Sequence, residues 1–340
     1  MTERLDVFMA RANAIYYAAH DPFANFTTAP EISQAFGEVL GLWAAVVWQS
    51  LGAPDPVLLV EAGPGRGTLM ADALRAVGRA MPAFRSAVRV HLIETSSRLR
   101  AAQAERLGDA TWHDSLATVP AGPLILLGNE FLDALPIRQF VRRAGGWTER
   151  YVDDGRIVEL PVGLLPPPVA ACWSGSDGTL PDGAIVEASD AARAFVAGIA
   201  ERLRGYPGAA LLLDYGPGET APGDSLQALR DGGPADPAGP AGSADLTAHV
   251  DFATLAAIAR DGGATVHGPL PQGLFLTRIG LMQRTGVLAR GLPPAPAAAM
   301  MAGAQRLTEP DRMGRLFKVM AMGTPGCATP PGFEEAVPSP

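Results

Sequence analysis

A chain of 340 residues, 48% of them hydrophobic, can bury a large core in one elaborated domain or two, which excludes a disordered or fibrous protein. The 27 Lys and Arg residues against 35 Asp and Glu give a net charge of −8, and no basic run interrupts this balance. The composition therefore does not suggest a nucleic-acid-binding surface. Lys318 is the only lysine, so chemistry that needs a lysine has a single candidate.

The cysteines and histidines do not indicate a metal site or a disulfide framework. Cys172 and Cys327 match neither a zinc spacing nor a CxxC pair, so we expect two reduced thiols. The histidines are also scattered, and no two stand at the spacing of metal ligands. We therefore expect no metal. The histidines are His20, His91, His113, His249 and His267.

No segment suits export or a membrane span. Residues 1–21 carry several charges and lack the apolar stretch of a secretory signal. The longest apolar run, residues 39–48, has about half of the roughly 20 residues that a membrane helix needs. We expect a soluble, cytoplasmic protein.

Residues 1–52 are expected to form an N-terminal helical cap. Apolar residues recur at helical spacing over residues 8–16 and again over residues 36–47. Between these helices, Thr28 followed by Glu31 resembles a capping box. Thr28 can therefore be a helix cap or a ligand contact, and both interpretations stay open.

From residue 57 the chain alternates short apolar strands with helices. This alternation predicts βαβ units and an α/β fold with a Rossmann-like, doubly wound, mostly parallel sheet. A ligand is then expected at the carboxyl ends of the strands. The core domain is expected over 53–140 and 205–323, with strands at 57–63, 88–95, 123–130, 209–216 and 314–323 and helices at 68–81, 97–107, 251–263 and 274–291.

Residues 141–204 interrupt this rhythm and are expected to form an inserted α+β substrate region. Residues 140–162 alternate like antiparallel strands joined by turns at Gly145-Gly146 and Asp154-Gly155. A helix is expected to follow over 188–204. The Gly- and Pro-rich residues 217–243 are predicted to form a loop, and residues 324–340 a disordered tail.

The sequence EAGPGRG, residues 61–67, joins the first strand of the core to the next helix. Its glycines let the backbone approach a ligand above a helix N-terminus. A P-loop would need a lysine that this turn lacks, and a dinucleotide fingerprint would need glycine where Thr68 stands. An acid two residues before GxGxG instead resembles motif I of the S-adenosylmethionine (SAM) methyltransferases. The candidate cofactor-binding residues here are Glu61, Gly63, Gly65 and Gly67.

Further acids favour SAM over a ligand that carries phosphate. SAM is a sulfonium with a free amino group and no phosphate, so Glu61 beside the turn does not repel it. Glu94 ends the next strand, where an acid can bind ribose hydroxyls. Asp114 is a candidate for the adenine amino group. Each acid also has a structural alternative: Glu61 can pair with an arginine, Glu94 can cap the next helix, and Asp114 can begin one.

Two longer segments make the resemblance specific. Residues 26–38 (FTTAPEISQAFGE) and 128–140 (GNEFLDALPIRQF), with the glycine motif between them, resemble the MidA-like family of class I SAM-dependent methyltransferases. Residues 243–252 and 313–320 are also similar to that family, so the resemblance covers about residues 13–322. It implies SAM as the cofactor.

In residues 26–38 the chain departs from the family pattern at one position. Ala29 stands where we expect serine in many relatives, which removes one hydroxyl that could contact the cofactor. Thr27 and Thr28 remain, and we count both as candidate cofactor-binding residues.

Some members of this family are mitochondrial and assist the assembly of respiratory complex I. The resemblance therefore implies methylation of an arginine in a complex I (NADH:quinone oxidoreductase) subunit, with the mitochondrial matrix as the location of eukaryotic relatives. One alternative is an assembly chaperone that binds SAM without needing catalysis. An NAD-dependent oxidoreductase is a less favoured alternative.

Asn129 and Glu130 are the candidate catalytic residues, because they follow a core strand at the position where such folds meet their substrate. A carboxylate binds a guanidinium in a bidentate manner, so Glu130 could hold an arginine with one nitrogen facing the methyl group. The alternative is that Asn129 and Glu130 only cap a turn. We expect Asp133 to be an exposed charge. Arg66 is expected to face solvent, with a contact to the cofactor carboxylate as the alternative. Asp214 and Tyr215 can border the substrate channel or only pack at a strand end.

Overall fold

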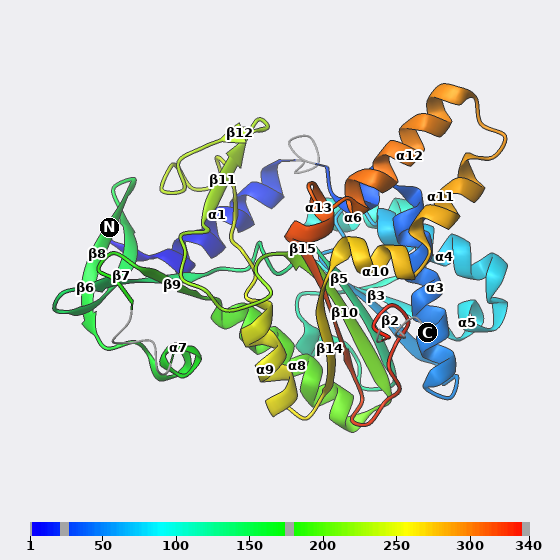
Figure 1. Cartoon of the computed structure of the whole chain (residues 1–340), viewed down its shortest axis with the longest axis horizontal. Helices are drawn as coiled ribbons and strands as arrows, with labels where there is room; N and C mark the ends of the chain where they lie inside the picture. Colours follow the sequence, from blue (N-terminus) through cyan, green and yellow to red (C-terminus); the bar gives the residue numbers. More distant parts are fainter. Residues whose placement is uncertain (1, 21–26, 174–179, 335–340) are drawn as a thin grey trace, which may run out of the picture.

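The computed structural model of the chain describes residues 2–20, 27–173 and 180–334. Its main sheet has the strands β2 (Val57–Ala62), β3 (Val88–Ile93), β4 (Thr111–His113), β5 (Leu124–Asn129), β10 (Gly208–Tyr215), β14 (Thr265–Pro271) and β15 (Phe317–Gly323). Their order is β14-β15-β10-β5-β2-β3-β4 (Figure 1). Only β15 runs opposite to its neighbours in this sheet. The expected α/β fold with a mostly parallel sheet is confirmed.

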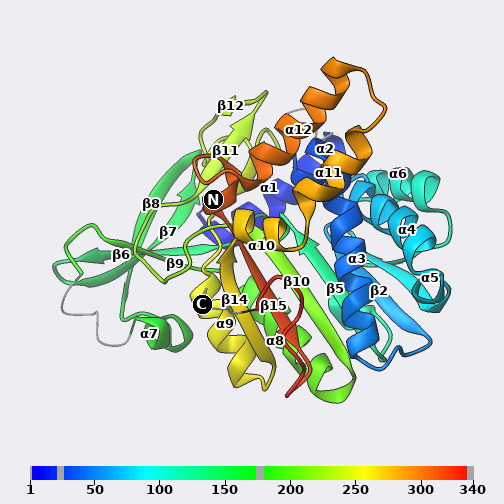
Figure 2. The same ribbon diagram turned by 45° about the vertical axis from the view of Figure 1, so that its right-hand side comes forward.

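Helices cover both faces of this sheet, as Figure 2 shows. Successive side chains of β2 point to opposite faces: Leu59 packs in one apolar layer and Leu58 and Val60 in the other. Full burial of one such side chain stabilises the fold by about 1.5–3 kcal/mol. The first layer includes α3 (Gln34–Ser50) and α4 (Thr68–Ala80), and the second includes α8 (Asp190–Gly205) and α9 (Phe252–Asp261). Two further helices, α5 (Pro82–Ala87) and α6 (Ser97–Leu107), lie between β2 and β4 in the chain.

The helices α3 and α4 touch closely, and this contact positions the glycine turn that precedes α4. A Cβ on Gly41 of α3 would lie only 2.6 Å from the Cα of Ala73 in α4. Only glycine allows the two helices to come this close. The packing of α3 against α4 in the first apolar layer therefore holds α4, and with it the glycine turn, in position.

A second, smaller body lies beside the main sheet (Figure 1). It is built on a five-stranded antiparallel sheet with the order β1-β7-β6-β9, and β8 pairs with β7. The strands are β1 (Glu3–Arg4), β6 (Arg138–Arg143), β7 (Gly146–Asp153), β8 (Arg156–Gly163) and β9 (Ile185–Ala188), and α7 (Pro167–Cys172) follows β8. The predicted antiparallel strands and the Asp154-Gly155 turn are confirmed, and both turn residues have positive φ.

The helix α1 (Leu5–Ala19) belongs with this second body. Its Leu5, Phe8 and Met9 pack in one cluster with residues of β7 and of a small three-stranded sheet. That sheet is formed by β11 (Gln227–Arg230), β12 (Gly233–Pro234) and β13 (Asp245–Thr247). The expected N-terminal cap is therefore divided, with α1 on the second body and α3 on the main sheet.

Several other boundaries differ from expectation. The helix α8 packs on the main sheet, although most of it was expected in the insert. The predicted loop 217–243 contains the β11–β12 hairpin, which turns at Asp231-Gly232. The single helix predicted over 274–291 is broken at Gly280, whose φ is 87°. The observed elements are α10 (Gln272–Arg278), α11 (Leu281–Ala289), α12 (Pro294–Thr308) and α13 (Met313–Leu316).

The prediction of a disordered tail is wrong over residues 324–334. The Trp43 side chain donates a hydrogen bond to the Pro331 carbonyl at 3.1 Å. Phe333 is buried, and its ring centroid lies 5.3 Å from that of Phe275. Residues 335–340, the rest of the predicted tail, lie outside the described residues.

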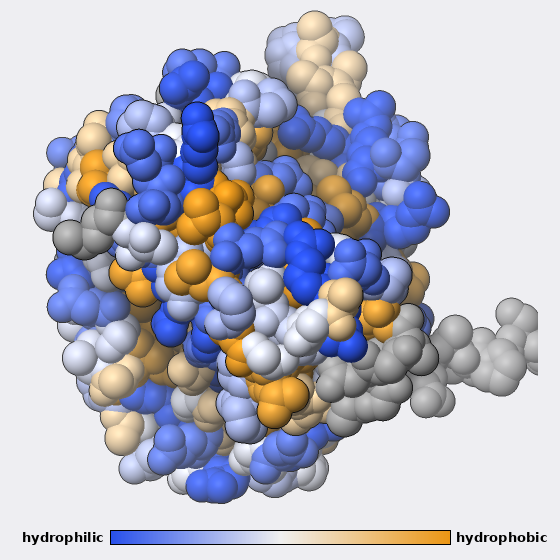
Figure 3. Space-filling model, turned by 90° about the vertical axis from the view of Figure 1, so that its left-hand side faces the viewer, coloured by the Kyte–Doolittle hydropathy of each residue, from blue (hydrophilic) through white to orange (hydrophobic). Residues whose placement is uncertain are grey.

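The surface on the side of the second body is mixed, with hydrophobic groups separated by hydrophilic ones (Figure 3). On β8, Leu160 and Val162 are exposed, and so is Leu164 just beyond the strand. Within the described ranges, no helix is both long and apolar enough to cross a membrane.

Candidate active site

A cavity of about 630 Å³ lies at the carboxyl ends of β2, β3 and β5, with one wall formed by α1. It is the position at which an open α/β sheet binds its ligand. The candidates that line this cavity are Thr28, Glu61, Gly63, Gly65, Glu94, Asp114, Asn129 and Glu130, whereas Thr27 and Gly67 do not line it.

The glycine turn has the backbone shape that its sequence predicts. Gly63, Gly65 and Gly67 all have positive φ, at 64°, 53° and 74°. A Cβ on Gly63 would lie 2.9 Å from the Phe131 ring, and Gly67 is the N-cap residue of α4. Gly67 therefore shapes the turn, while Gly63 and Gly65 face the cavity. The Gln103 side chain holds the turn by donating to the Gly65 carbonyl at 2.7 Å.

Glu61 lies beneath the turn and is almost inaccessible to solvent. Burial raises the pKa of its carboxyl group to about 8, although a hydrogen bond from the Met70 backbone opposes this shift. Its Oε2 atom has no hydrogen-bond partner among the described residues. The expected pairing with an arginine is absent from the ion pairs of these residues, so Glu61 can still accept a hydrogen bond from a ligand.

Glu94 and Asp114 line the far part of the cavity. Glu94 Oε1 accepts the Ser96 backbone N–H at 2.8 Å. The alternative that Glu94 caps α6 is wrong, because the N-cap residue is Ser96, whose side chain accepts the Leu99 N–H. Burial raises the pKa of Glu94, against opposing hydrogen bonds from Ser96 and Gln103. Asp114 pairs with Arg100 at 2.6 Å, and 81% of its side chain is exposed.

Asn129 and Glu130 end β5 and face the same cavity as the glycine turn. Glu130 Oε1 accepts the Ala29 backbone N–H at 2.9 Å and the Asn129 side-chain N–H at 3.1 Å. Burial raises the pKa of Glu130. Glu130 has a φ of 51°, a strained conformation for a residue other than glycine and one that is concentrated at functional sites.

Asn129 Oδ1 is buried without a hydrogen-bond partner among the described residues. No described group donates to Glu130 Oε2 either. The end of β5 therefore presents two oxygen acceptors to the cavity.

Behind Glu130 lies a group of buried acids. Asp214 Oδ2 accepts the backbone N–H groups of Phe131, Leu132 and Asp133, which fixes the segment after Glu130. Burial raises the pKa of Asp214 to about 7, and burial together with Asp214 holds the pKa of Asp133 well above its usual range. The prediction that Asp133 is an exposed charge is wrong, because it is 8% exposed.

Two predictions about the N-terminal segment and the turn also need correction. Thr28 is the N-cap residue of α2 (Ala29–Ile32), but its side chain makes no capping hydrogen bond. Glu31 does not complete a capping box, since its carboxylate accepts the Thr68 hydroxyl at 2.5 Å. Arg66 was expected to face solvent, yet it is half-buried and lines the cavity.

The sequence did not indicate that α1 contributes to this site. Tyr17 and Asn13 line the cavity from α1. Asn13 donates to the Ala134 and Leu246 carbonyls at 3.1 and 2.8 Å, and Tyr17 donates to Asp245 at 2.7 Å. A polar residue within the apolar period of a helix was the available signal, but it does not reveal its partners, which lie more than a hundred residues away.

The residues present fit SAM. The buried Oε2 atom of Glu61, which has no partner among the described residues, suits the amino group of SAM, and the glycine turn leaves no side chain to collide with it. Glu94 suits ribose hydroxyls. The cavity contains no lysine, and its buried acids would repel a diphosphate. No cluster of three His, Cys, Asp or Glu side chains that could hold a metal was found in the part of the chain that the structure describes.

The parallel sheet, the glycine turn and the acids that end β2 and β3 together define a class I SAM-dependent methyltransferase. A family model described as "Putative S-adenosyl-L-methionine-dependent methyltransferase" matches residues 39–270. The chain belongs to this family, and the expected cofactor, SAM, is confirmed.

Similar proteins include one from Drosophila melanogaster named "Protein arginine methyltransferase NDUFAF7 homolog, mitochondrial", which is 34% identical over 95% of this chain and 80% of its own length. The human protein arginine methyltransferase NDUFAF7, also named mitochondrial, is 32% identical over 90% of this chain and 76% of its own length. A solved structure of a Burkholderia thailandensis protein bound to S-adenosyl-homocysteine superposes with a TM-score of 0.79 at 26% identity, covering 99% of this chain and 89% of that one.

Proposed function

We propose that this methyltransferase transfers the methyl group of SAM to a guanidinium nitrogen of an arginine in a protein. The observation that carries the proposal is the free acceptor side of Glu130, in the same cavity as the glycine turn. A buried carboxylate with one unused oxygen is suited to a cationic guanidinium, whose charge offsets the cost of burying the acid. The names of the similar proteins support arginine as the target.

Bound SAM supplies an electrophilic methyl group on its sulfonium. The Gly63–Gly67 turn and Glu61 hold its amino-acid end, Glu94 accepts its ribose hydroxyls, Asp114 receives its adenine amino group, and Thr28 bounds the site from α2. Thr27, which lies outside the cavity lining, is the candidate with the weakest support.

Glu130 and Asn129 position the nucleophile. Glu130 Oε2 and Asn129 Oδ1 accept N–H groups of the substrate guanidinium and orient the remaining nitrogen toward the methyl group. Methyl transfer would form an N–C bond, break the S–C bond and release a proton from this nitrogen, and Glu130, directly after β5 in the cavity wall, would accept that proton.

We further propose a subunit of respiratory complex I as the substrate and the cytoplasm as the location. The substrate rests on the family resemblance and on the names of the similar proteins, whereas the location is carried over from the expectation based on the sequence. Mass spectrometry of complex I subunits from cells with and without the gene tests it. The expected result is an arginine whose mass is higher by about 14 Da per methyl group only when the gene is present. Identical arginine masses in the two samples would contradict the proposal.

The rival function is that of a chaperone that binds SAM without needing catalysis. The Glu130→Gln variant distinguishes this function from methyl transfer. The matched control is Glu105→Gln, since Glu105 is exposed on α6, away from the cavity lining. If methylation is the essential role, the Glu130 variant fails to restore complex I in knockout cells while the Glu105 variant succeeds. Restoration by a Glu130 variant that leaves the arginine unmethylated would favour the chaperone.

A further inference from the structure

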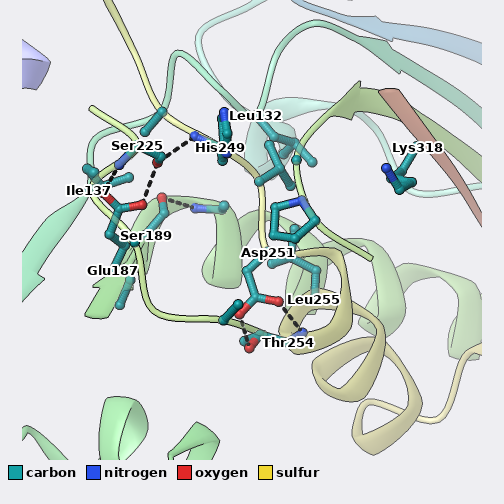
Figure 4. A pocket seen from close by; sticks show the side chains of 18 of the residues that line it. Leu132, Ile137, Glu187, Ser189, Ser225, His249, Asp251, Thr254, Leu255 and Lys318 are labelled. Carbon is teal, nitrogen blue, oxygen red and sulfur yellow. Dashed lines mark hydrogen bonds between the residues drawn. The ribbon is translucent and has the colours of Figure 1, made fainter. Parts of the chain in front are cut away.

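A second cavity, of about 580 Å³, lies next to the candidate active site across residues 131–137. Leu132 and Ile137 line this second cavity, whereas Phe131 and Leu135 line the first. We call it the Lys318 pocket, because the single lysine of the chain lies in its wall. In Figure 4 the Lys318 ammonium points into the pocket from the side opposite Glu187 and Ser225.

Two half-buried acids of the Lys318 pocket already accept hydrogen bonds from neighbouring groups. Glu187 accepts the Ser225 backbone N–H at 3.0 Å, the Ser225 hydroxyl at 2.5 Å and the Gln139 side chain at 2.6 Å. Asp251 caps α9 by accepting the Thr254 backbone N–H at 3.0 Å and also accepts the Thr220 hydroxyl. Neither carboxylate forms an ion pair with Lys318 or Arg315 in the described ranges.

The cationic side chains of this pocket differ in whether an acid or another group already binds them. Arg312 pairs with Glu309 at 3.0 Å, and Arg193 donates to the Pro168 carbonyl. Lys318 instead donates only to the backbone carbonyls of Arg315 and Leu316, at 2.6 and 3.2 Å.

Arg315 is exposed at the rim, and no acid forms an ion pair with it or with Lys318 in the described ranges. Asp311 also lies at the rim without such a pair.

The pKa shifts of two groups in the wall indicate that cation-forming side chains lie near one another. The pKa of Lys318 is lowered by burial and then by Arg315. The pKa of His249, also in the wall, is lowered by burial and then by Lys318. Arg315 therefore disfavours the charged form of Lys318, and Lys318 disfavours the charged form of His249. An anion between these side chains would offset this repulsion.

We propose that the Lys318 pocket binds an anionic group, a carboxylate or a phosphate, held by Lys318 and Arg315 with His249 beside them. An ammonium with one unused N–H and a guanidinium with no partner can each form a charge-assisted hydrogen bond to such a group. The anion site does not depend on the proposed arginine methylation. If that function holds, the adjacent position makes the pocket suitable for an acidic residue of the polypeptide whose arginine enters the first cavity.

Calorimetric titration of the full chain with inorganic phosphate, at an ionic strength kept constant with NaCl, tests the anion site. Arg315→Gln removes one cation and no hydrogen bond between described residues, so it is expected to leave the fold intact, while Lys318→Met keeps the apolar stem of the second. Each is expected to weaken phosphate binding at least about tenfold, the loss of one charge-assisted hydrogen bond. Arg260→Gln is the matched control, because Arg260 is exposed at the far end of α9 and should leave the affinity unchanged.

A wild-type chain that binds no phosphate, or an Arg315→Gln variant that binds it like wild type, would overturn the proposal. A second titration identifies the source of the anion, using arginine peptides with glutamate at several distances from the arginine. Displacement of phosphate by a glutamate peptide, but not by its glutamine counterpart, assigns the site to the protein substrate. Phosphate binding that no peptide displaces assigns it to a free anion. Since neither readout requires methyl transfer, failure here is distinct from failure of the proposed activity.

Discussion

Glu130 accepts the backbone N–H of Ala29 at 2.9 Å, so the acid at the end of β5 is joined to a short helix 101 residues earlier in the chain. This hydrogen bond fixes α2 over the cavity and also determines which Glu130 oxygen remains for a substrate.

Replacing Glu130 should loosen α2 only when the new side chain has no oxygen to accept the Ala29 N–H. Glu130→Ala is expected to speed amide exchange over residues 29–32 by about fivefold, because a hydrogen bond of this kind contributes about 1 kcal/mol. Glu130→Gln keeps an oxygen for the Ala29 N–H and should leave the exchange close to wild type. Hydrogen exchange followed by mass spectrometry measures both. Equal exchange in the alanine variant and wild type would show that this hydrogen bond does not hold α2.

Gly65→Val should abolish SAM binding without unfolding the chain. The φ of 53° at Gly65 is costly for a β-branched residue, and the new side chain would occupy the cavity wall. Calorimetry should show at least about a hundredfold loss of SAM affinity. Gly145→Val is the control, since a Cβ at Gly145 meets nothing within 4 Å. A folded Gly65 variant with wild-type affinity would remove the glycine turn from the cofactor site.

Glu61 should make stability depend on pH. Its folded pKa, about 8, is raised above the usual value of 4.5 by burial, so the protonated form is the one that favours folding. This contribution is fully present below about pH 4.5 and is lost as the pH rises through about 8. Urea unfolding of the SAM-free chain should therefore show that Glu61→Gln becomes more stable relative to wild type by up to about 1.4 kcal/mol per pH unit. Parallel stability profiles for the two proteins would refute the raised pKa.

The C-terminal residues 324–334 should contribute measurably to the stability of the main domain. Phe333→Ala removes a buried ring in contact with Phe275 and should lower the free energy of unfolding by about 3 kcal/mol. Thr329→Ala, at an exposed position of the same segment, should change it by less than about 0.5 kcal/mol. Chemical denaturation compares the two. An equally small effect at both positions would indicate that this segment is not held against the core in solution.

The main sheet was predictable from sequence because its signal is local. In β2, β5 and β10 the strands are short, apolar and followed by glycine or polar residues, and the helices between them have clear periods. Prolines and glycines were the main source of error. Three prolines at the start of α12 concealed a helix, although proline is tolerated in the first turn. The Gly-rich residues 217–243 concealed a hairpin.

The lining of the candidate site was predictable where an acid or glycine lies at or just after the end of a strand, as at Glu61, Gly65 and Glu94. Contacts between residues far apart in the chain could not be predicted from the sequence pattern in this way. Nothing near Asp133 in the sequence indicates that it lies against Asp214, and nothing in α1 indicates that Asn13 reaches β13. Such contacts depend on how the second body folds back, which sequence periodicity does not specify.

The helix α1 makes contacts on two of its faces. One packs into the second body through Leu5 and Met9, and the other lines the candidate active-site cavity through Asn13 and Tyr17. A protein that presses on the second body thus acts on a wall of the cofactor site. Thermodynamic reciprocity then requires that whatever factor substrate binding applies to SAM affinity, SAM binding applies to substrate affinity. If the substrate contacts the second body, the affinity of the chain for that substrate is therefore expected to depend, through α1, on whether SAM is bound.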